Sequence, residues 1–347
     1  MQRLDTSSES PWVSAVVYGR SGAGKSSLGV TAPKPLILLS EAQGMLAIRQ
    51  AAKRLGVPVP PVIFLETLED CRNVLRALRG PKTEPFRVLE VVGYDPETGQ
   101  ALRDDTGAVK RRVVFELPAA EWPETVVLDT TTDMMRLVEQ EIREQSPPKQ
   151  GRDGLPVDSE RFWNVLGDRC KNVLYGFRDA PLHKLFLCQE DDRDIGEGDE
   201  KRRNLGPAMP MRKLPALLSG CGNLTAYAYR REVRENQNVR VVYGVMTTGP
   251  EYMMLKPCAP LRPAERADFS FWVKAIRGTL EGGMPAAPAP SAESLAQGVS
   301  EADLPQEPQR EAPAAPAAKE AEEAPPPMAE PPKAAKAAKG ASKRGAR

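Results

Sequence analysis

The chain has 347 residues, and its 48 lysines and arginines almost balance its 47 aspartates and glutamates, which leaves a formal charge of +1. This balance excludes an overall field that would draw the protein onto nucleic acid or a membrane, so any such binding must be local. No apolar run is long enough to cross a membrane, and the start MQRLDTSSESPW lacks the apolar stretch of a signal peptide, so we expect a soluble intracellular protein without membrane contact.

Apolar runs typical of β-strands alternate with helical patterns from residue 14 onward. Strands are predicted at 14–19, 35–40, 61–67, 125–130 and 182–189, and helices from Lys25 and at 44–56, 68–80, 132–145 and 162–177. Because the strands are apolar throughout, the alternation predicts an α/β fold, a mainly parallel sheet between helices. Two further runs, 224–233 and 239–248, predict an antiparallel extension of this sheet around the polar turn RENQN.

Two segments depart from this alternation. Residues 81–120 place strand-like runs on both sides of the turn-rich DPETGQALRDDTG, which predicts an inserted β-ribbon. Residues 283–347 hold 20 alanines, 12 prolines and no aromatic residue, which predicts a disordered tail after a folded domain at 1–282. The tail ends in the basic PPKAAKAAKGASKRGAR, which is either simply solvated or a weak contact for nucleic acid.

The segment between the first strand and its helix has the form GxxxxGK[ST], a complete phosphate loop. The glycines let backbone N–H groups turn toward a phosphate, the helix dipole adds positive charge, and the Lys25 ammonium bridges the β- and γ-phosphates. Ser26 offers its hydroxyl to Mg²⁺, so the loop predicts ATP and Mg²⁺ as ligands. The residues predicted to bind the nucleotide are Gly19, Arg20, Ser21, Gly22, Ala23, Gly24, Lys25, Ser26 and Ser27.

A second carboxylate for the metal ion is expected at the end of a buried strand beside the loop strand. The run ETVVLD ends in Asp129 and fits this pattern, so Asp129 is predicted to hold the hydrated Mg²⁺ together with Ser26. An aspartate at this place could instead cap the helix that follows, because aspartate is a common N-cap.

The catalytic carboxylate must come from elsewhere in the chain. AAA-type motors and helicase loaders usually place a glutamate directly after the Walker B aspartate, whereas Thr130 follows Asp129 here. Glu41 comes just after the second strand, at the edge where open α/β sheets bind ligands, and is predicted to activate the attacking water. The alternative is a glutamate that only interacts with a helix dipole.

His183, the single histidine, is predicted to be a packing or surface residue.

Together these motifs resemble the RecA-like ATPases. More narrowly, YGRSGAGKSSLGVTAPKPLILLSEAQG and TVVLDTTTDM are similar to the compact phage-encoded RecA-like ATPases linked to single-strand annealing and recombination. The resemblance spans residues 14–256. It implies a RecA-like P-loop core, single-stranded DNA as a partner, a homo-oligomer, and a place in the host cytoplasm. A single-strand-binding or replication protein is a further partner in this family.

The resemblance also implies roles for single residues. Gln189 would sense the γ-phosphate, and the loop that follows, from Glu190 to Met211, would contact single-stranded DNA. This loop holds seven acids before Lys201, Arg202 and Arg203, so a merely solvated loop is the alternative to phosphate contacts by these three residues. Lys256 matches the cation that a neighbouring subunit supplies, with Arg262 as the next basic residue.

The sequence therefore predicts an ATPase that acts on single-stranded DNA in phage recombination, repair or replication. One alternative is a loader or adaptor whose ATP site switches binding to a protein partner. A second is a small-molecule kinase, but such an enzyme needs an arginine-rich lid, and the one arginine cluster is followed by NLGPAMP, which is more typical of a loop.

Overall fold

The structure is a computed structural model that describes residues 11–96, 98–145, 147–150, 156–195, 202–235 and 238–280. These residues all belong to one compact unit, Met1–Pro305. The tail predicted at 283–347 and the DNA contact predicted at Lys201 lie outside the described residues. No helix within the described ranges is long and apolar enough to span a membrane.

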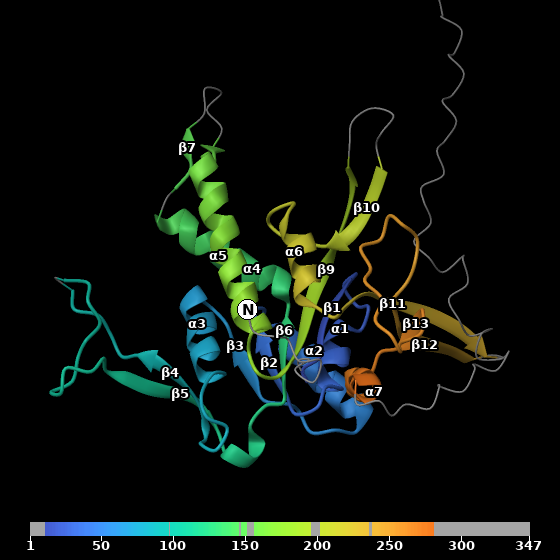
Figure 1. Cartoon of the computed structure of the whole chain (residues 1–347), viewed down its shortest axis with the longest axis horizontal. Coiled ribbons are helices and arrows are strands. Elements are labelled where there is room, and N and C mark those ends of the chain that lie inside the picture. The colour runs from blue at the N-terminus through green and yellow to red at the C-terminus, as the bar shows by residue number, and fades with distance from the viewer. Residues whose placement is uncertain are drawn as a thin grey trace, which may run out of the picture. The chain divides into compact units, whose positions relative to one another are not determined.

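A mostly parallel sheet forms the centre of this unit, which confirms the predicted α/β fold (Figure 1). Its strands follow the order β13-β12-β11-β1-β9-β6-β2-β3, and β10 pairs with β9. The strands from β11 to β3 in this order are parallel, whereas β12, β13 and β10 are antiparallel to their neighbours. The bounds are β1 (Ser14–Gly19), β2 (Pro35–Leu39), β3 (Val62–Phe64), β6 (Thr125–Asp129), β9 (His183–Ile195), β10 (Arg202–Pro207), β11 (Leu224–Glu235), β12 (Asn238–Met246) and β13 (Ala264–Arg266).

The strand of Asp129 does not lie beside the loop strand, so this prediction was wrong. β9 lies between β1 and β6 and pairs with both. Its residues 185–188 are fully buried, as a strand at the centre of a sheet covered on both faces must be. This strand order brings Gln189 of β9 between the phosphate loop and Asp129. Gln189 pairs with Gly19 of β1, and Leu187, two residues earlier, pairs with Asp129 of β6.

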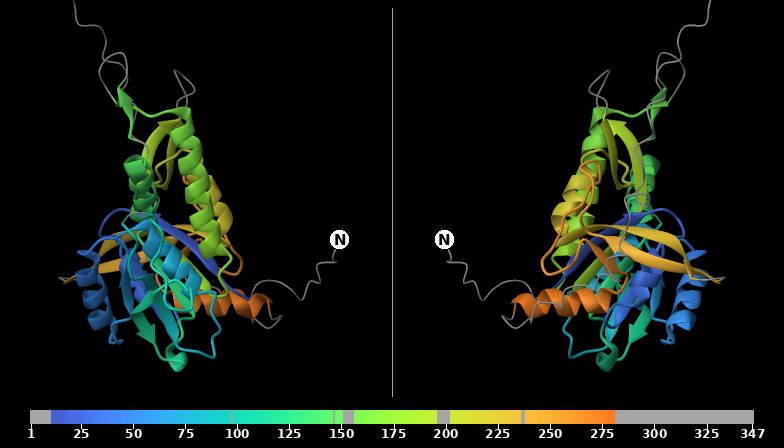
Figure 2. Two further views of the ribbon diagram at one scale, coloured as in Figure 1. Left: turned by 90° about the vertical axis from the view of Figure 1, so that its left-hand side faces the viewer. Right: turned by 90° about the vertical axis from the view of Figure 1, so that its right-hand side faces the viewer.

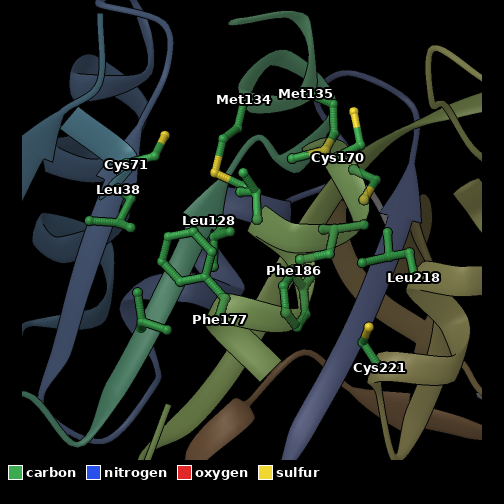
Figure 3. Packing of buried hydrophobic residues seen from close by; sticks show 14 of the residues in the cluster. Leu38, Cys71, Leu128, Met134, Met135, Cys170, Phe177, Phe186, Leu218 and Cys221 are labelled. Atoms are coloured by element: carbon green, nitrogen blue, oxygen red, sulfur yellow. The ribbon is translucent and has the colours of Figure 1, made fainter. Parts of the chain in front are cut away.

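Helices cover both faces of the sheet (Figure 2). Successive strand residues alternate between the two faces, so that Val127 packs with α1, α2 and α7, whereas Leu128 packs with α3 to α6. Phe186 of β9, Phe177 of α5 and Met134 of α4 belong to the cluster on the face covered by α3 to α6 (Figure 3). The helices are α1 (Lys25–Val30), α2 (Gly44–Leu55), α3 (Leu68–Ala77), α4 (Thr131–Gln145), α5 (Glu160–Arg178), α6 (Leu214–Cys221) and α7 (Phe269–Leu280).

The interruption predicted at 81–120 contains a β-ribbon, as expected. β4 (Phe86–Val91) and β5 (Arg111–Leu117) pair antiparallel and project from the sheet (Figure 1). Phe86 anchors the base of the ribbon because its ring is buried edge-to-face against Phe115 and Trp122. A short second pair, β7 (Lys149–Gln150) and β8 (Pro156–Val157), lies between α4 and α5.

The prediction of a loop from Glu190 to Met211 was wrong. β9 continues to Ile195, and β10 pairs back onto it, so the chain forms a hairpin that we call the arm, residues 190–195 and 202–207. Cross-strand charge explains why an acidic run forms a strand here. Arg203 pairs with Asp192 across the arm at 2.8 Å, and the fully buried Leu205 fixes its root.

Candidate functional site

The phosphate loop turns between β1 and α1, as predicted. Gly22 and Gly24 have φ angles of +77° and +85°, a left-handed backbone that favours glycine. Gly24 also has no space for a side chain, because a Cβ atom there would lie 2.6 Å from Cδ1 of Tyr243 on β12. Sequence reasoning missed Tyr243, because it packs on the loop from a strand that is distant in the sequence.

Lys25 is buried at the start of α1, with 8% of its surface exposed. Its Nζ donates to the carbonyl oxygens of Gly19 at 2.6 Å and Arg20 at 2.7 Å. Burial lowers the pKa of Lys25, and the nearby charge of Asp129 opposes this shift. An ammonium group has three donors, so one N–H remains for a phosphate oxygen.

Asp129 ends β6 with 5% of its surface exposed. Burial raises the pKa of Asp129, while a hydrogen bond with Ser26 and the charge of Lys25 oppose the shift. Asp129 does not cap α4, because the Asp133 N–H donates to the hydroxyl of Thr130 at 3.2 Å. The contact with Ser26 brings the two predicted metal ligands together.

Three buried oxygen atoms at this edge have no hydrogen-bond partner among the residues that the structure describes. They are Oδ2 of Asp129, Oγ of Ser40, the residue after β2, and Oγ1 of Thr131, the first residue of α4. Ser40 and Asp129 are neighbours, since the Ser40 N–H donates to the Asp129 carbonyl at 3.2 Å. Buried polar atoms are normally paired, so these oxygens indicate a place for a polar ligand or an ion. Sequence reasoning missed Ser40 because a serine after an apolar strand carries no distinctive pattern.

Glu41, the predicted catalytic base, lies exposed between β2 and α2. Its carboxyl group forms a hydrogen bond with Asp133, which raises the pKa of Glu41, and burial and the charge of Asp129 raise it further. Arg136 opposes the shift. Glu41 therefore reaches the edge that holds Asp129. Sequence reasoning missed Asp133, because an acid in the first turn of a helix is common.

Gln189, the predicted sensor, lies within β9 and not at its end. Its backbone N–H donates to the Thr132 hydroxyl at 3.0 Å, and its Nε2 donates to Oδ2 of Asp133 at 3.4 Å. The Thr132 hydroxyl donates in turn to the carbonyl of Ala208, just after β10, at 3.0 Å. The first turn of α4 thus contacts both sides of the root of the arm.

The arm also contacts the phosphate loop directly. Nε of Arg20 lies 2.9 Å from Oε1 of Glu190, the first residue of the arm, and Tyr227 donates to Oε2 of Glu190 at 2.9 Å. Glu190 was not predicted as part of the site, since in the sequence it is only the first of seven acids. This ion pair places the loop arginine beside the residue that follows Gln189.

Ser27, predicted at the nucleotide, faces the side of the loop on which Tyr243 packs. Nη2 of Arg54 donates to the Ser27 hydroxyl at 2.7 Å, and the Arg54 guanidinium lies over the Tyr243 ring, 5.0 Å from its centroid. Arg54 therefore bridges α2, the loop and β12.

The predicted intersubunit cation lies away from the loop of its own chain. Lys256 pairs with Thr225 near the amino end of β11, and its Nζ donates to the Gly222 carbonyl at 2.6 Å. Thr225 pairs with Val16 of β1, which comes three residues before Gly19. The backbone of Lys256 therefore lies about 10 Å along the strands from the level of Gly19, where the phosphate loop begins. Arg262 is paired with Glu265 at 2.9 Å.

The predicted DNA contacts differ in their surroundings. Arg202 is exposed on β10. The Arg203 guanidinium is already paired, because Nε and Nη2 donate to the two carboxylate oxygens of Asp192 at 2.9 and 2.8 Å and the group lies over the Tyr252 ring.

His183 is 3% exposed and accepts a hydrogen bond from the Val13 N–H at 2.9 Å, which confirms a packing role.

Comparisons with known proteins point to one family. A family model described as AAA domain matches residues 13–252, a range that includes the loop, Glu41, Asp129 and the arm and ends before Lys256. No curated protein matches the chain. Among solved structures, a KaiC-like protein from the hyperthermophilic archaeon Pyrococcus horikoshii OT3 is 9% identical, with a TM-score of 0.30; the match covers 73% of this chain and 83% of that chain.

Proposed function

Because this chain belongs to the AAA domain family, we propose that it binds ATP with Mg²⁺ in the loop between β1 and α1 and hydrolyses the ATP to ADP and phosphate. The observation that carries this proposal is a set of incompletely paired polar groups at one edge of the sheet. Oδ2 of Asp129 and Oγ of Ser40 lack partners among the described residues, and Lys25 uses two of its three donors. A phosphate anion with its cation would supply a partner for each group.

Each residue of the edge has a role in the proposed reaction. Backbone N–H groups of residues 19–26 and the Lys25 ammonium hold the phosphates, while Ser26 and Asp129 would hold Mg²⁺, which neutralises charge on the phosphate oxygens. Glu41 removes a proton from water as the water oxygen bonds to the γ-phosphorus. The bond from the γ-phosphorus to the bridging oxygen breaks, and ADP leaves with that oxygen. In this proposal the Gln189 amide hydrogen-bonds the γ-phosphate.

Phosphate release by the purified full chain tests this function. Lys25→Ala should abolish release and greatly weaken binding of a fluorescent ATP analogue, because the ammonium is the main side-chain charge on the phosphates. Lys53→Ala, at an exposed position of α2, is the matched control and should behave as wild type. Equal release by Lys25→Ala and wild type would contradict the assignment of the loop.

We also propose single-stranded DNA in phage recombination, repair or replication as the partner of this ATPase, since basic side chains are exposed on and after the arm whose root holds Gln189. They are Arg202 on β10 and Arg212 and Lys213 before α6. Arg203 is not among them, because Asp192 already pairs with its guanidinium. A loader or adaptor that is switched by ATP for a protein partner is the alternative.

Binding of labelled single-stranded DNA at increasing salt, with and without ATP, separates these two functions. Arg202→Ala should weaken binding and reduce the salt slope by about one phosphate contact, whereas Arg203→Ala should leave the slope unchanged. Stimulation of phosphate release by DNA would favour the recombination function. If the full chain binds no DNA even at low salt, the partner-switch alternative replaces it.

The position of Lys256, remote from the loop of its own chain, supports a homo-oligomer in which this lysine completes the site of a neighbouring copy. Complementation tests this arrangement. Lys25→Ala and Lys256→Ala should each be inactive alone, and mixing them should restore part of the activity, because some mixed interfaces contain both lysines. Inactive mixtures of variants that still assemble would contradict a role across the interface.

A further inference from the structure

Arg54, near the end of α2, holds its guanidinium group beside the phosphate loop. We propose that Arg54 is a nucleotide-binding residue, which donates to phosphate oxygens at the α-phosphate end of ATP or ADP. This inference rests on the proposed binding of ATP and adds a residue from outside the GxxxxGK[ST] motif. Arg54 follows Ser27 by 27 residues, so only the fold brings the two together.

Two neutral groups hold the Arg54 guanidinium at the loop. Nη2 donates to the Ser27 hydroxyl at 2.7 Å, and the guanidinium carbon lies 5.0 Å from the centroid of the Tyr243 ring. The ring is itself fixed, because it packs so closely on Gly24 that a Cβ atom there would lie 2.6 Å from Cδ1 of Tyr243. The ring and the hydroxyl orient the cation without neutralising its charge.

Arg54 differs in this respect from other arginines around the site. Arg20 pairs with Glu190 at 2.9 Å, and Arg203 pairs with Asp192 at 2.8 Å. Within the described ranges no carboxylate pairs with Arg54, and a single N–H of its guanidinium donates a hydrogen bond. The remaining donors suit the bidentate contact that arginine makes with phosphate oxygens.

The order of the strands decides which phosphate Arg54 meets. The groups proposed to act at the γ-phosphate, Gln189, Asp129 and Glu41, belong to β9, to β6 and to the residues after β2, all on one side of β1. Tyr243 belongs to β12, on the other side of β1. A triphosphate whose γ-phosphate lies at Asp129 therefore extends its α-phosphate toward Tyr243 and the guanidinium that covers it.

A contact with the α-phosphate end has a distinctive effect on the kinetics. ATP, ADP and the transition state of hydrolysis all carry this phosphate, so the contact stabilises the three to a similar extent. Such uniform binding raises the affinity for nucleotide and lowers KM, but it does not speed the chemical step. Arg54 is therefore expected to act on binding, in contrast to Glu41.

Competition binding and phosphate release by the full chain test the proposal. Unlabelled ATP, ADP and inorganic triphosphate displace a fluorescent ATP analogue in the presence of Mg²⁺. Arg54→Ala should weaken all three ligands by about tenfold, because a charge-assisted hydrogen bond is lost, and raise KM by a similar factor, with kcat within about twofold of wild type. Arg54→Lys should recover part of the affinity, since it keeps the charge and loses the bidentate geometry.

Arg49→Ala is the matched control. It removes the same charge from an exposed position on the same helix, so it should bind all three ligands as wild type does. Equal affinities in Arg54→Ala and Arg49→Ala would overturn the proposal. A fall in the melting temperature of nucleotide-free Arg54→Ala that Arg49→Ala does not share would also overturn it, because Arg54 would then serve the fold.

The three ligands show which part of the nucleotide Arg54 contacts. A loss for ATP with unchanged affinity for ADP would overturn the proposal by placing Arg54 at the γ-phosphate. A loss for ATP and ADP with unchanged affinity for inorganic triphosphate would overturn it by assigning Arg54 to the ribose or the base. A wild-type chain that binds none of these ligands would instead refute the proposed function, and this inference with it.

Discussion

Two glycines of the phosphate loop provide a matched pair for testing the geometry of the site. Gly22 and Gly24 share a left-handed backbone, with φ angles of +77° and +85°. Nothing lies within 4 Å of a Cβ atom built on Gly22, whereas a Cβ atom on Gly24 would lie 2.6 Å from Cδ1 and 3.0 Å from Cγ of Tyr243. Gly22→Ala should therefore lower the free energy of unfolding only by the cost of the left-handed backbone, about 1–2 kcal/mol.

Gly24→Ala bears the same backbone cost and an additional overpacking cost. Forcing a methyl group against an aromatic ring costs about 1–3 kcal/mol, so the free energy of unfolding should fall by about 2–5 kcal/mol in total. Urea denaturation followed by circular dichroism, without nucleotide, measures both variants. In a Tyr243→Ala background the effect of Gly24→Ala should shrink to that of Gly22→Ala. Equal losses for the two glycines in the wild-type background would refute the packing of Tyr243 on the loop.

Three further predictions concern pH and the tail. Because Asp133 raises the pKa of Glu41 and the base must be ionised, kcat should rise with pH through a limb above the usual glutamate range, and Asp133→Asn should move that limb to lower pH; an unmoved limb contradicts the contact. Burial lowers the pKa of His183 from 6.5 to about 4, so the folded state disfavours the charged imidazole. The free energy of unfolding measured in urea titrations should therefore be highest above pH 6.5 and about 2 kcal/mol lower at pH 5, and His183→Asn should remove this decrease. Deleting residues 283–347 should leave phosphate release and the melting temperature unchanged, and a large drop in melting temperature would show that this segment packs on the domain.

The loop and the parallel sheet could be predicted because their signals are local. The run from Gly19 to Ser26 fixes its own turn through glycines and a helix start, and apolar runs between helices fix a parallel sheet. The ends of two such strands also place Glu41 and Asp129 at one edge. Their contacts with Asp133 and Ser26 agree with that expectation.

The order of the strands and the shape of the arm could not be predicted in the same way. β6 and β9 are apolar runs of similar character, and nothing local decides which of them neighbours β1. The acids from Glu190 onward are typical of a solvated loop until the register is known, because only the register brings Asp192 within reach of Arg203. Ser40 and Tyr243 matter through neighbours that are distant in sequence, and no short pattern reports such contacts.

The central claim is that this edge of the sheet hydrolyses ATP with Glu41 as the base. The most direct measurement compares wild type and Glu41→Gln for binding of a fluorescent ATP analogue and for phosphate release in a single turnover. The account predicts that Glu41→Gln binds the nucleotide with unchanged affinity in the presence of Mg²⁺ and releases no phosphate, since glutamine keeps the size of the side chain and cannot accept the proton. Normal phosphate release by Glu41→Gln would contradict the account, because the catalytic carboxylate would then have to lie elsewhere.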